Sequence, residues 1–359
     1  MKEKNNGYFQ LEKSYKYTLN AIPRGRLESR PITNSCNIPW RTITIDDNLN
    51  CILCSCDGWL PIPVGQVFDF DTIEQVFQSN IAKIIQTDIE HKKYTWCAVQ
   101  NCGIKNHDNH VNNYEIVINI DRSCNLQCPS CRREKYLVTS GEIYDKKIKA
   151  SEQILQWLEK FDHSVNIITS GDGDPLASLI MRPIIKNWKP KSNQNLTLKT
   201  NGLLIKKQLN DINLLNNISN FSISIDAGSQ EVYEKVRLGG SWKVLIENFN
   251  FLKENKRQAE TCLDFVIQNN NYEDLENFIL LCEQYQFKGT VSQLDNWGTW
   301  NNKKVLEPDQ WTQENGYFFD HDVLKQTHPN YNRCKKIVQK HLTNPLIGYS
   351  PAVLERLNL

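Results

Sequence analysis

From about residue 114 onward, the sequence alternates short apolar runs with helical patterns. The apolar runs cover residues 115–120, 165–169, 195–199, 220–226, 262–268 and 288–294. Apolar residues with helical spacing lie between them, for example Ile154, Leu155, Leu158 and Phe161. Six strand–helix units in series predict a parallel sheet with right-handed crossovers. The pattern allows either an open Rossmann-like layer or a curved part-barrel.

Three cysteines follow the first of these runs, in Asp121-Arg-Ser-Cys-Asn-Leu-Gln-Cys-Pro-Ser-Cys-Arg132. The thiolates of Cys124, Cys128 and Cys131 are one ligand short of a complete 4Fe–4S site, which takes four cysteines. A cluster held in this way leaves one iron open to another ligand. The alternatives are a zinc site and buried free thiols.

Polar and glycine-rich segments stand at the ends of four later strands, where ligands gather in parallel α/β folds. They are Ser170-Gly-Asp-Gly-Asp-Pro-Leu176, Thr200-Asn-Gly202, the end of Phe221-Ser-Ile-Ser-Ile-Asp-Ala227, and Asp295-Asn-Trp-Gly-Thr-Trp300. Together with the cysteine loop, these segments predict one binding rim.

The CxxxCxxC loop after a first strand resembles that of the radical SAM superfamily. The resemblance implies an α/β fold with a partial (β/α)6 TIM-like barrel at residues 113–300. It also implies that S-adenosylmethionine (SAM) binds the open iron of a 4Fe–4S cluster. A reduced cluster would cleave SAM to a 5′-deoxyadenosyl radical, which abstracts hydrogen from a substrate C–H bond. The electron donor would be a flavodoxin or a ferredoxin.

The same resemblance implies which residues contact SAM. Gly171, Asp172, Gly173 and Asp174 resemble the family's GGEP element, with Asp174 in place of glutamate, and its backbone would bind the SAM amino group. Thr200, Asn201, Ser224 and Asp226 match positions near the ribose or carboxylate, and Val266 would lie near the adenine. Arg237 resembles the arginine that pairs with the SAM carboxylate, although a surface helix charge is equally consistent. Ser130 replaces an aromatic residue that many members carry.

A second cysteine-rich unit precedes the barrel, and it resembles the SPASM/twitch auxiliary-cluster domain. The resemblance runs from Cys36-Asn-Ile-Pro-Trp40 through Trp59-Leu-Pro61 to Cys102, although that domain more often follows the barrel. It implies one auxiliary 4Fe–4S cluster within an N-terminal α+β domain at residues 34–112. The predicted ligands are Cys36, Cys54, Cys97 and Cys102, with Cys56 or Cys51 as alternatives to Cys54. A tetrahedral zinc site on the same residues is the other interpretation.

Within this unit, Asp71-Thr-Ile-Glu74 predicts a capping box that opens one helix. The apolar positions of that helix share one face and are Ile73, Val76, Phe77, Ile81, Ile84 and Ile85.

The composition narrows the function classes. Lys plus Arg (42) balances Asp plus Glu (41), so no strong global charge predicts binding to nucleic acid or acidic membranes. No apolar run approaches the ~20 residues that span a bilayer, and the N-terminus has no apolar signal region. We therefore expect a cytoplasmic protein with reduced thiols. Residues 1–33 form a polar segment, and residues 301–359 are expected to cover one end.

Three further cysteines and the substrate complete the predictions. Cys262 and Cys282 are expected in the core, whereas Cys334 is a candidate hydrogen-atom donor or iron ligand. The predicted substrate is a peptide or protein residue that is oxidised, crosslinked or epimerised. The alternatives are a small-molecule dehydrogenase or epimerase acting on a sugar or aminoglycoside-like substrate, and a non-catalytic iron–sulfur or zinc scaffold.

Overall fold

The computed structural model describes residues 35–55, 60–97, 102, 110–132, 134–169, 173–255, 260–295 and 316–359. Some predictions therefore fall outside the described residues. They concern Cys56, Trp59, Gly171, Asp172 and the segments 1–33 and 296–315.

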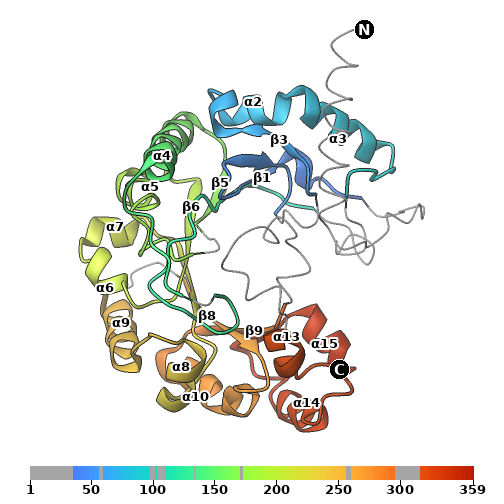
Figure 1. The fold of residues 1–359 in the computed structure, drawn as a ribbon, viewed down its shortest axis with the longest axis vertical. Helices are drawn as coiled ribbons and strands as arrows, with labels where there is room; N and C mark the ends of the chain where they lie inside the picture. The colour runs from blue at the N-terminus through green and yellow to red at the C-terminus, as the bar shows by residue number, and fades with distance from the viewer. Residues whose placement is uncertain are drawn as a thin grey trace. The chain divides into compact units, whose positions relative to one another are not determined.

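Ten strands form one sheet in the order β10-β9-β8-β7-β6-β5-β4-β1-β2-β3 (Figure 1). Their bounds are β1 Thr42–Ile45, β2 Asn50–Ile52, β3 Pro63–Gln66, β4 Tyr114–Ile118, β5 Val165–Thr169, β6 Gln194–Thr200, β7 Asn220–Ser224, β8 Glu260–Ile267, β9 Lys288–Gln293 and β10 Ile347–Tyr349. Among the described strands, β3 and β10 are the two edges, so the sheet is not closed. The fold is mixed α/β with a mostly parallel sheet, and the six predicted strands are observed as β4 to β9.

The helices alternate with the strands from β4 onward, as the sequence predicts. Their bounds are α2 Ile73–Gln78, α3 Asn80–Glu90, α4 Glu142–Lys160, α5 Arg182–Asn187, α6 Ile205–Gln208, α7 Ile212–Asn216, α8 Gln230–Val236, α9 Trp242–Asn255, α10 Leu275–Tyr285, α13 Gly316–His321, α14 Tyr331–Lys340 and α15 Pro351–Leu357. Short 3₁₀ turns occur at Ile38–Trp40, Val67–Asp69 and Tyr272–Asp274. No described helix combines the length and apolar character needed to cross a bilayer.

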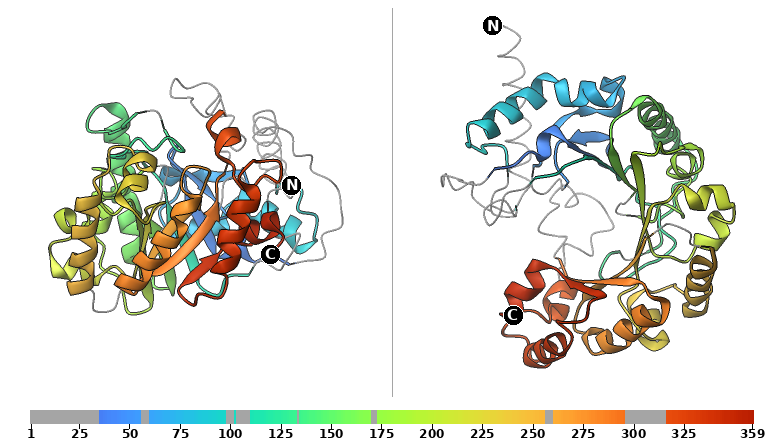
Figure 2. Two further views of the ribbon diagram at one scale, coloured as in Figure 1. Left: turned by 90° about the horizontal axis from the view of Figure 1, so that it is seen from below. Right: turned by 180° about the vertical axis from the view of Figure 1, so that it is seen from behind.

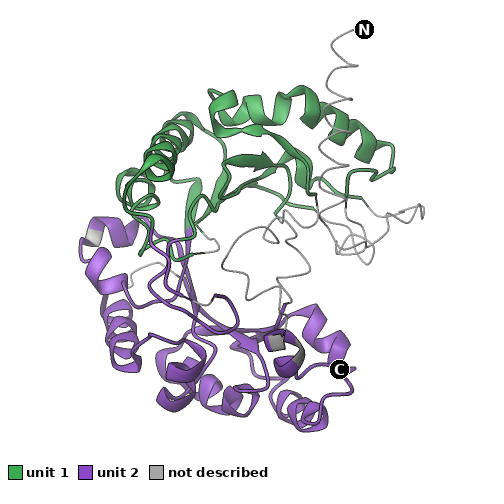
Figure 3. Ribbon diagram, viewed as in Figure 1, with its two compact units in different colours: residues 1–122, 138–196, 299–306 green, residues 123–137, 197–298, 307–359 purple. Residues whose placement is uncertain are grey.

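The chain divides into two compact units (Figure 3). Unit 1 contains residues 1–122, 138–196 and 299–306, and unit 2 contains residues 123–137, 197–298 and 307–359. The cysteine loop therefore belongs to unit 2, together with the strands from β7 to β10.

In unit 1, the N-terminal cysteine-rich residues supply strands β1, β2 and β3. Strand β2 pairs antiparallel with both β1 and β3, and β1 pairs parallel with β4. Thr42 of β1 is in register with Glu115 of β4, so this part extends the barrel sheet. Ile43 and Ile45 are fully buried, since both faces of β1 are covered. The Asn37 side chain exchanges hydrogen bonds with the Val111 backbone, at 2.9 and 2.7 Å. These bonds join the segment before β1 to the segment before β4.

In unit 2, the two faces of β8 differ. Leu263, Phe265 and Ile267 are buried, and the Phe265 ring lies 4.9 Å from the ring of Phe278 in α10. Helix α10 lies along this part of the sheet (Figure 2). The opposite face carries the half-buried residues Cys262, Asp264 and Val266. The strand thus presents a polar face away from α10.

The predicted helix after residue 71 is two helices, because the chain is extended at Ser79 (φ −60°, ψ 157°). The Ser79 side chain accepts a hydrogen bond from Ala82 N and begins α3. The N-cap of α2 is Thr72, which accepts from Gln75 N at 3.4 Å. The predictions of a single helix and of a cap at Asp71 were therefore wrong. Serine and threonine side chains that bond to nearby backbone groups compete with continuation of a helix.

Candidate functional site

Backbone hydrogen bonds hold the cysteine loop of unit 2. Cys124 N donates to Tyr136 O at 2.7 Å, and Gln127 N donates to Leu238 O at 3.1 Å. A tight turn follows, in which Cys131 N donates to Cys128 O at 2.8 Å. Cys128 is buried, Cys124 is half-buried and Cys131 is exposed. The loop thus presents three thiols from a fixed backbone.

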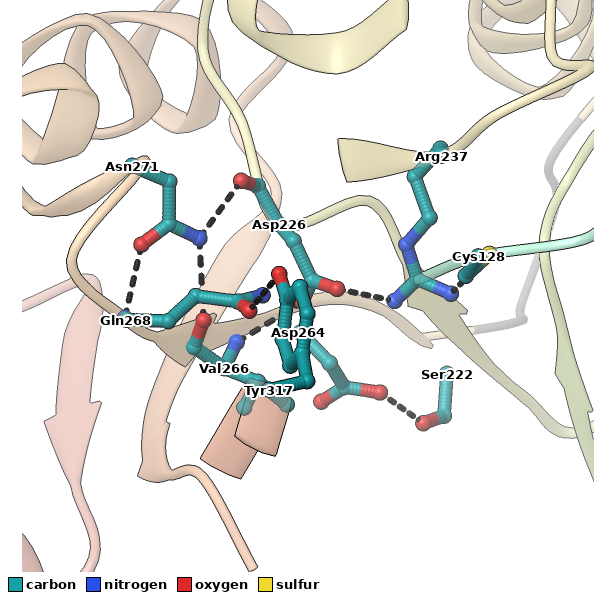
Figure 4. Close-up of polar contacts among 9 residues, drawn as sticks. All are labelled: Cys128, Ser222, Asp226, Arg237, Asp264, Val266, Gln268, Asn271 and Tyr317. Carbon is teal, nitrogen blue, oxygen red and sulfur yellow. Dashed lines mark hydrogen bonds and ion pairs between the residues drawn. The ribbon is translucent and has the colours of Figure 1, made fainter. Parts of the chain in front are cut away.

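Arg237 links this loop to the end of β7 (Figure 4). Its Nη2 lies 2.7 Å from Asp226 Oδ2, and its Nη1 lies 3.9 Å from Cys128 Sγ. The two side chains are 14% and 3% exposed, so the ion pair is shielded from water. Arg237 Nε is buried and has no hydrogen-bond partner among the described residues. The surface-charge interpretation of Arg237 was therefore wrong.

Burial is the largest single influence on the pKa of each of these three side chains. It raises the pKa of the Asp226 carboxyl, against the opposing effects of Arg237 and the Val266 N–H. For Arg237, burial opposes the charge, but Asp226 and Cys128 outweigh it, and the pKa lies above its ordinary value. Burial also raises the pKa of the Cys128 thiol to about 12, although Arg237 lowers it. Iron binding must therefore displace a proton from this thiol.

Asp226 adopts the left-handed conformation (φ 53°) that aspartate tolerates better than most residues. Its Oδ1 accepts from Val266 N at 2.8 Å, and its backbone oxygen accepts from Asn271 Nδ2 at 2.9 Å. Asn271 also donates to Val266 O at 2.9 Å. This network joins the end of β7 to the end of β8, the strand that contains Val266.

Tyr317 of α13 reaches the same network (Figure 4). Its hydroxyl donates to Gln268 Oε1 at 2.8 Å and accepts from Asn270 Nδ2 at 3.0 Å. Burial raises the pKa of Tyr317 to about 12. Gln268 is fully buried, and its Nε2 has no partner among the described residues. Sequence reasoning missed Asn271 and Tyr317, and nothing in their local sequence signals these contacts.

Asp264 is a further polar residue that sequence reasoning missed. Ser222 donates a hydrogen bond to its Oδ2 from the neighbouring strand. On the same face of β8, Cys262 Sγ lies 3.1 Å from Thr290 Oγ1. The alternation of Cys262, Asp264 and Val266 was the available signal, since residues two apart share a strand face.

Asn201 contacts the cysteine loop. Its Nδ2 donates to Asn125 Oδ1 at 2.9 Å and lies 3.9 Å from Cys124 Sγ. Thr200 is buried, and its Oγ1 accepts from Gly202 N at 3.2 Å. Gly202 has φ 82°, and a side chain there would meet Ile223 at 2.7 Å. Ser224 is half-buried at the end of β7.

Asp174 lies in unit 1, where its side chain stabilises its own turn. Its Oδ1 accepts from Leu176 N at 2.9 Å and from Ala177 N at 3.2 Å. The residue is buried, and its backbone oxygen also accepts from Ala177 N at 3.0 Å and from Ser178 N at 3.1 Å. Nearby, Ser178 donates to Asp121 Oδ2 at 2.5 Å.

Three other N-terminal cysteines of unit 1 act electrostatically on Cys97. Burial raises the pKa of Cys97 well above its ordinary value, and repulsion from Cys54, Cys102 and Cys36 adds to it. Cys51 is different, because its charged neighbours are Asp46 and Asp69. Thr44 Oγ1 ties residue 54 to β1 by donating to its backbone oxygen at 2.6 Å.

Cys334 lies in α14 and is fully buried. Burial raises the pKa of its thiol to about 12. Cys282 is also fully buried, in α10, whereas Cys262 is half-buried.

No three His, Cys, Asp or Glu side chains in the described ranges are already arranged to hold a single metal ion. A 4Fe–4S cluster makes a different demand, because each thiolate binds its own iron. The three thiols of the loop have the chemistry for that group, and the guanidinium of Arg237 beside Cys128 suits a ligand set of net negative charge.

Residues 118–282 match a family described as the Radical SAM superfamily. Curated relatives include a GTP 3′,8-cyclase of Alkaliphilus metalliredigens, 30% identical over 170 residues, which covers 45% of this chain and 50% of the relative. A probable GTP 3′,8-cyclase of Methanococcus maripaludis strain C5 is 28% identical over 127 residues, 34% of this chain and 40% of the relative. The chain spans about half or less of these relatives.

Similar solved structures include Streptococcus suis SuiB bound to the precursor peptide SuiA. It has a TM-score of 0.45 and 15% identity, and the match covers 77% of this chain and 64% of that chain. Another is anSMEcpe with bound AdoMet, with a TM-score of 0.38, 20% identity, and coverage of 50% and 51%.

Proposed function

We propose that this chain, whose residues 118–282 match the Radical SAM superfamily, holds a 4Fe–4S cluster on Cys124, Cys128 and Cys131 and cleaves SAM. The observation that carries the proposal is the three-cysteine loop inside the matched residues. When bound and reduced, the cluster supplies the electron that splits SAM into methionine and a 5′-deoxyadenosyl radical. A flavodoxin or ferredoxin is the proposed electron donor, and the cytoplasm is the proposed location.

The protein's own residues would then bind and orient SAM. Arg237 and Asp226 are the proposed charged contacts, supported by their place beside Cys128. Val266, Ser224 and Thr200 are proposed to line the nucleoside, and Asn201 acts through the loop that it contacts. The backbone from Gly171 to Asp174 is proposed for the amino group. The polar network around Asp226 would keep these groups fixed, which lowers the reorganisation needed for reaction.

The test is anoxic reconstitution with iron and sulfide, followed by dithionite and SAM. The wild type should bind sulfide with iron and release 5′-deoxyadenosine. The Cys124→Ala/Cys128→Ala/Cys131→Ala variant should release none, whereas Cys262→Ala, which removes a thiol outside the loop, should retain release. A fully loaded wild type that releases no 5′-deoxyadenosine would favour the non-catalytic scaffold.

We also propose one auxiliary 4Fe–4S cluster on Cys36, Cys54, Cys97 and Cys102. The effect of Cys36, Cys54 and Cys102 on the pKa of Cys97 supports it. Cys51 is the less favoured ligand, because its charged neighbours are Asp46 and Asp69. Iron and acid-labile sulfide are counted in the triple loop variant. The count should fall further on Cys97→Ala and stay unchanged on Cys51→Ala. Bound zinc without sulfide would identify the tetrahedral zinc site instead.

The proposed substrate is a peptide or protein residue. A small molecule is the second candidate, and the curated relatives named GTP 3′,8-cyclase favour a nucleotide within that class. Asp264 of β8 and its hydrogen-bond partner Ser222 of β7 are the proposed polar groups that orient a substrate. Transfer of deuterium from labelled peptides or from labelled GTP into 5′-deoxyadenosine separates the two classes.

A further inference from the structure

The buried guanidinium of Arg237 stands between a cluster ligand and a buried carboxylate. Its Nη1 lies 3.9 Å from Cys128 Sγ, and its Nη2 lies 2.7 Å from Asp226 Oδ2. Each nitrogen thus contacts a different partner. A flexible ammonium could not hold both partners with the same planar geometry.

Both ends of the Arg237 side chain are held. Its backbone is fixed at the C-terminal end of α8, where Arg237 N donates to Tyr233 O at 2.8 Å, and its guanidinium is held by Asp226. Asp226, in turn, is held by Val266 N, and its backbone oxygen by Asn271. With the side chain 14% exposed, water screens this charge only weakly.

A fixed positive charge beside a ligand sulfur acts on the cluster's charge. Net charge, hydrogen bonds to the sulfurs and solvent exposure set the reduction potentials of iron–sulfur clusters. Reduction adds one negative charge, which a neighbouring guanidinium stabilises and a neighbouring carboxylate destabilises. Arg237 and Asp226 therefore push the potential in opposite directions, and Arg237 is the one that contacts the ligand sulfur, at 3.9 Å.

We propose that Arg237 is a positioning residue that raises the reduction potential of the cluster bound at Cys128, and that Asp226 moderates this effect through the ion pair. This inference rests on the proposed cluster on Cys124, Cys128 and Cys131. In this proposal, the Asp226–Arg237 pair sets how readily the cluster accepts its electron. This effect is separate from any contact that either residue makes with SAM.

The test is an anoxic redox titration of the reconstituted protein without SAM, followed by electron paramagnetic resonance. To leave one cluster, every protein carries Cys97→Ala. Arg237→Gln should make reduction at least tenfold less favourable, a shift of about 59 mV to lower potential for one electron. Arg237→Lys, which keeps the charge and loses the fork, should fall between Arg237→Gln and the parent. Asp226→Asn should move the potential upward.

The matched control is Lys235→Gln, which removes the same charge from the exposed face of α8, where Lys235 pairs with Glu231 at 2.8 Å. It should leave the potential unchanged. An Arg237→Gln potential equal to that of Lys235→Gln overturns the inference. If Arg237→Gln takes up no cluster, Asp226→Asn decides, and an unshifted or lowered potential overturns it. A parent protein that binds no cluster would instead overturn the proposed function.

Discussion

Asp226 and Arg237 form a buried ion pair of 2.7 Å at the end of β7. They are only eleven positions apart in the sequence, but Asp226 adopts the left-handed conformation (φ 53°), and Arg237 lies beyond the whole of α8. The pair joins that helix to the strand edge, so its loss should affect both stability and the site.

Removing the carboxylate should destabilise the protein strongly. Asp226→Ala leaves the buried Arg237 charge without its partner, and breaking a buried pair in this way costs about 3–5 kcal/mol. Urea unfolding of the metal-free protein, followed by circular dichroism, measures the loss. Glu231→Ala is the control, since it breaks only the exposed pair with Lys235. Equal midpoints for the two variants would contradict the burial argument.

Gly228 should be irreplaceable for steric reasons. A Cβ at this position would lie 1.9 Å from the backbone nitrogen of Phe278, so α10 would have to move away from the strand ends. We expect Gly228→Ala to cost more than about 4 kcal/mol or to prevent folding. Gly348→Ala, whose nearest contact would be 3.9 Å, should change the melting temperature little. Similar melting temperatures would show that α10 is free to shift.

The stability that Tyr317 contributes should be lost at alkaline pH. Its phenol has a pKa near 12 in the folded protein because of burial, compared with 10.0 when unperturbed. A raised folded pKa means that the contribution is complete below pH 10 and is lost as the pH rises through about 12. At pH 8, Tyr317→Phe should cost about 1–3 kcal/mol, since buried Gln268 loses a donor. This difference should shrink between pH 10 and 12. A constant difference would exclude ionisation of Tyr317.

The thiols should differ sharply in reactivity. Cys334 is fully buried, and burial raises its pKa to about 12, whereas Cys131 is exposed. Brief iodoacetamide treatment of the native, metal-free protein at pH 8 should alkylate Cys131 and spare Cys334, as measured by peptide mass spectrometry. Urea should remove the difference, and cluster loading should protect Cys131. Rapid labelling of native Cys334 would contradict this expectation and would favour Cys334 as a hydrogen donor that can reach a substrate.

Local patterns were sufficient for much of the fold. The strands β4 to β9 were predicted because alternating and continuous apolar runs mark strands wherever a sheet is covered. Helix ends were harder. Ser79 and Thr72 fixed the ends of α2 and the start of α3, and the sequence alone did not show which of several polar side chains would cap.

The sequence by itself determined that three thiols lie on one short loop after a strand, because their spacing is covalent. It also determined the order of strands and helices, because the periodic spacing of apolar residues depends only on neighbours along the chain. Only the tertiary structure decided that Arg237 meets Cys128, 109 residues away, and that Tyr317 meets Gln268. Such contacts depend on how packed elements bring distant side chains together, and no local pattern encodes that.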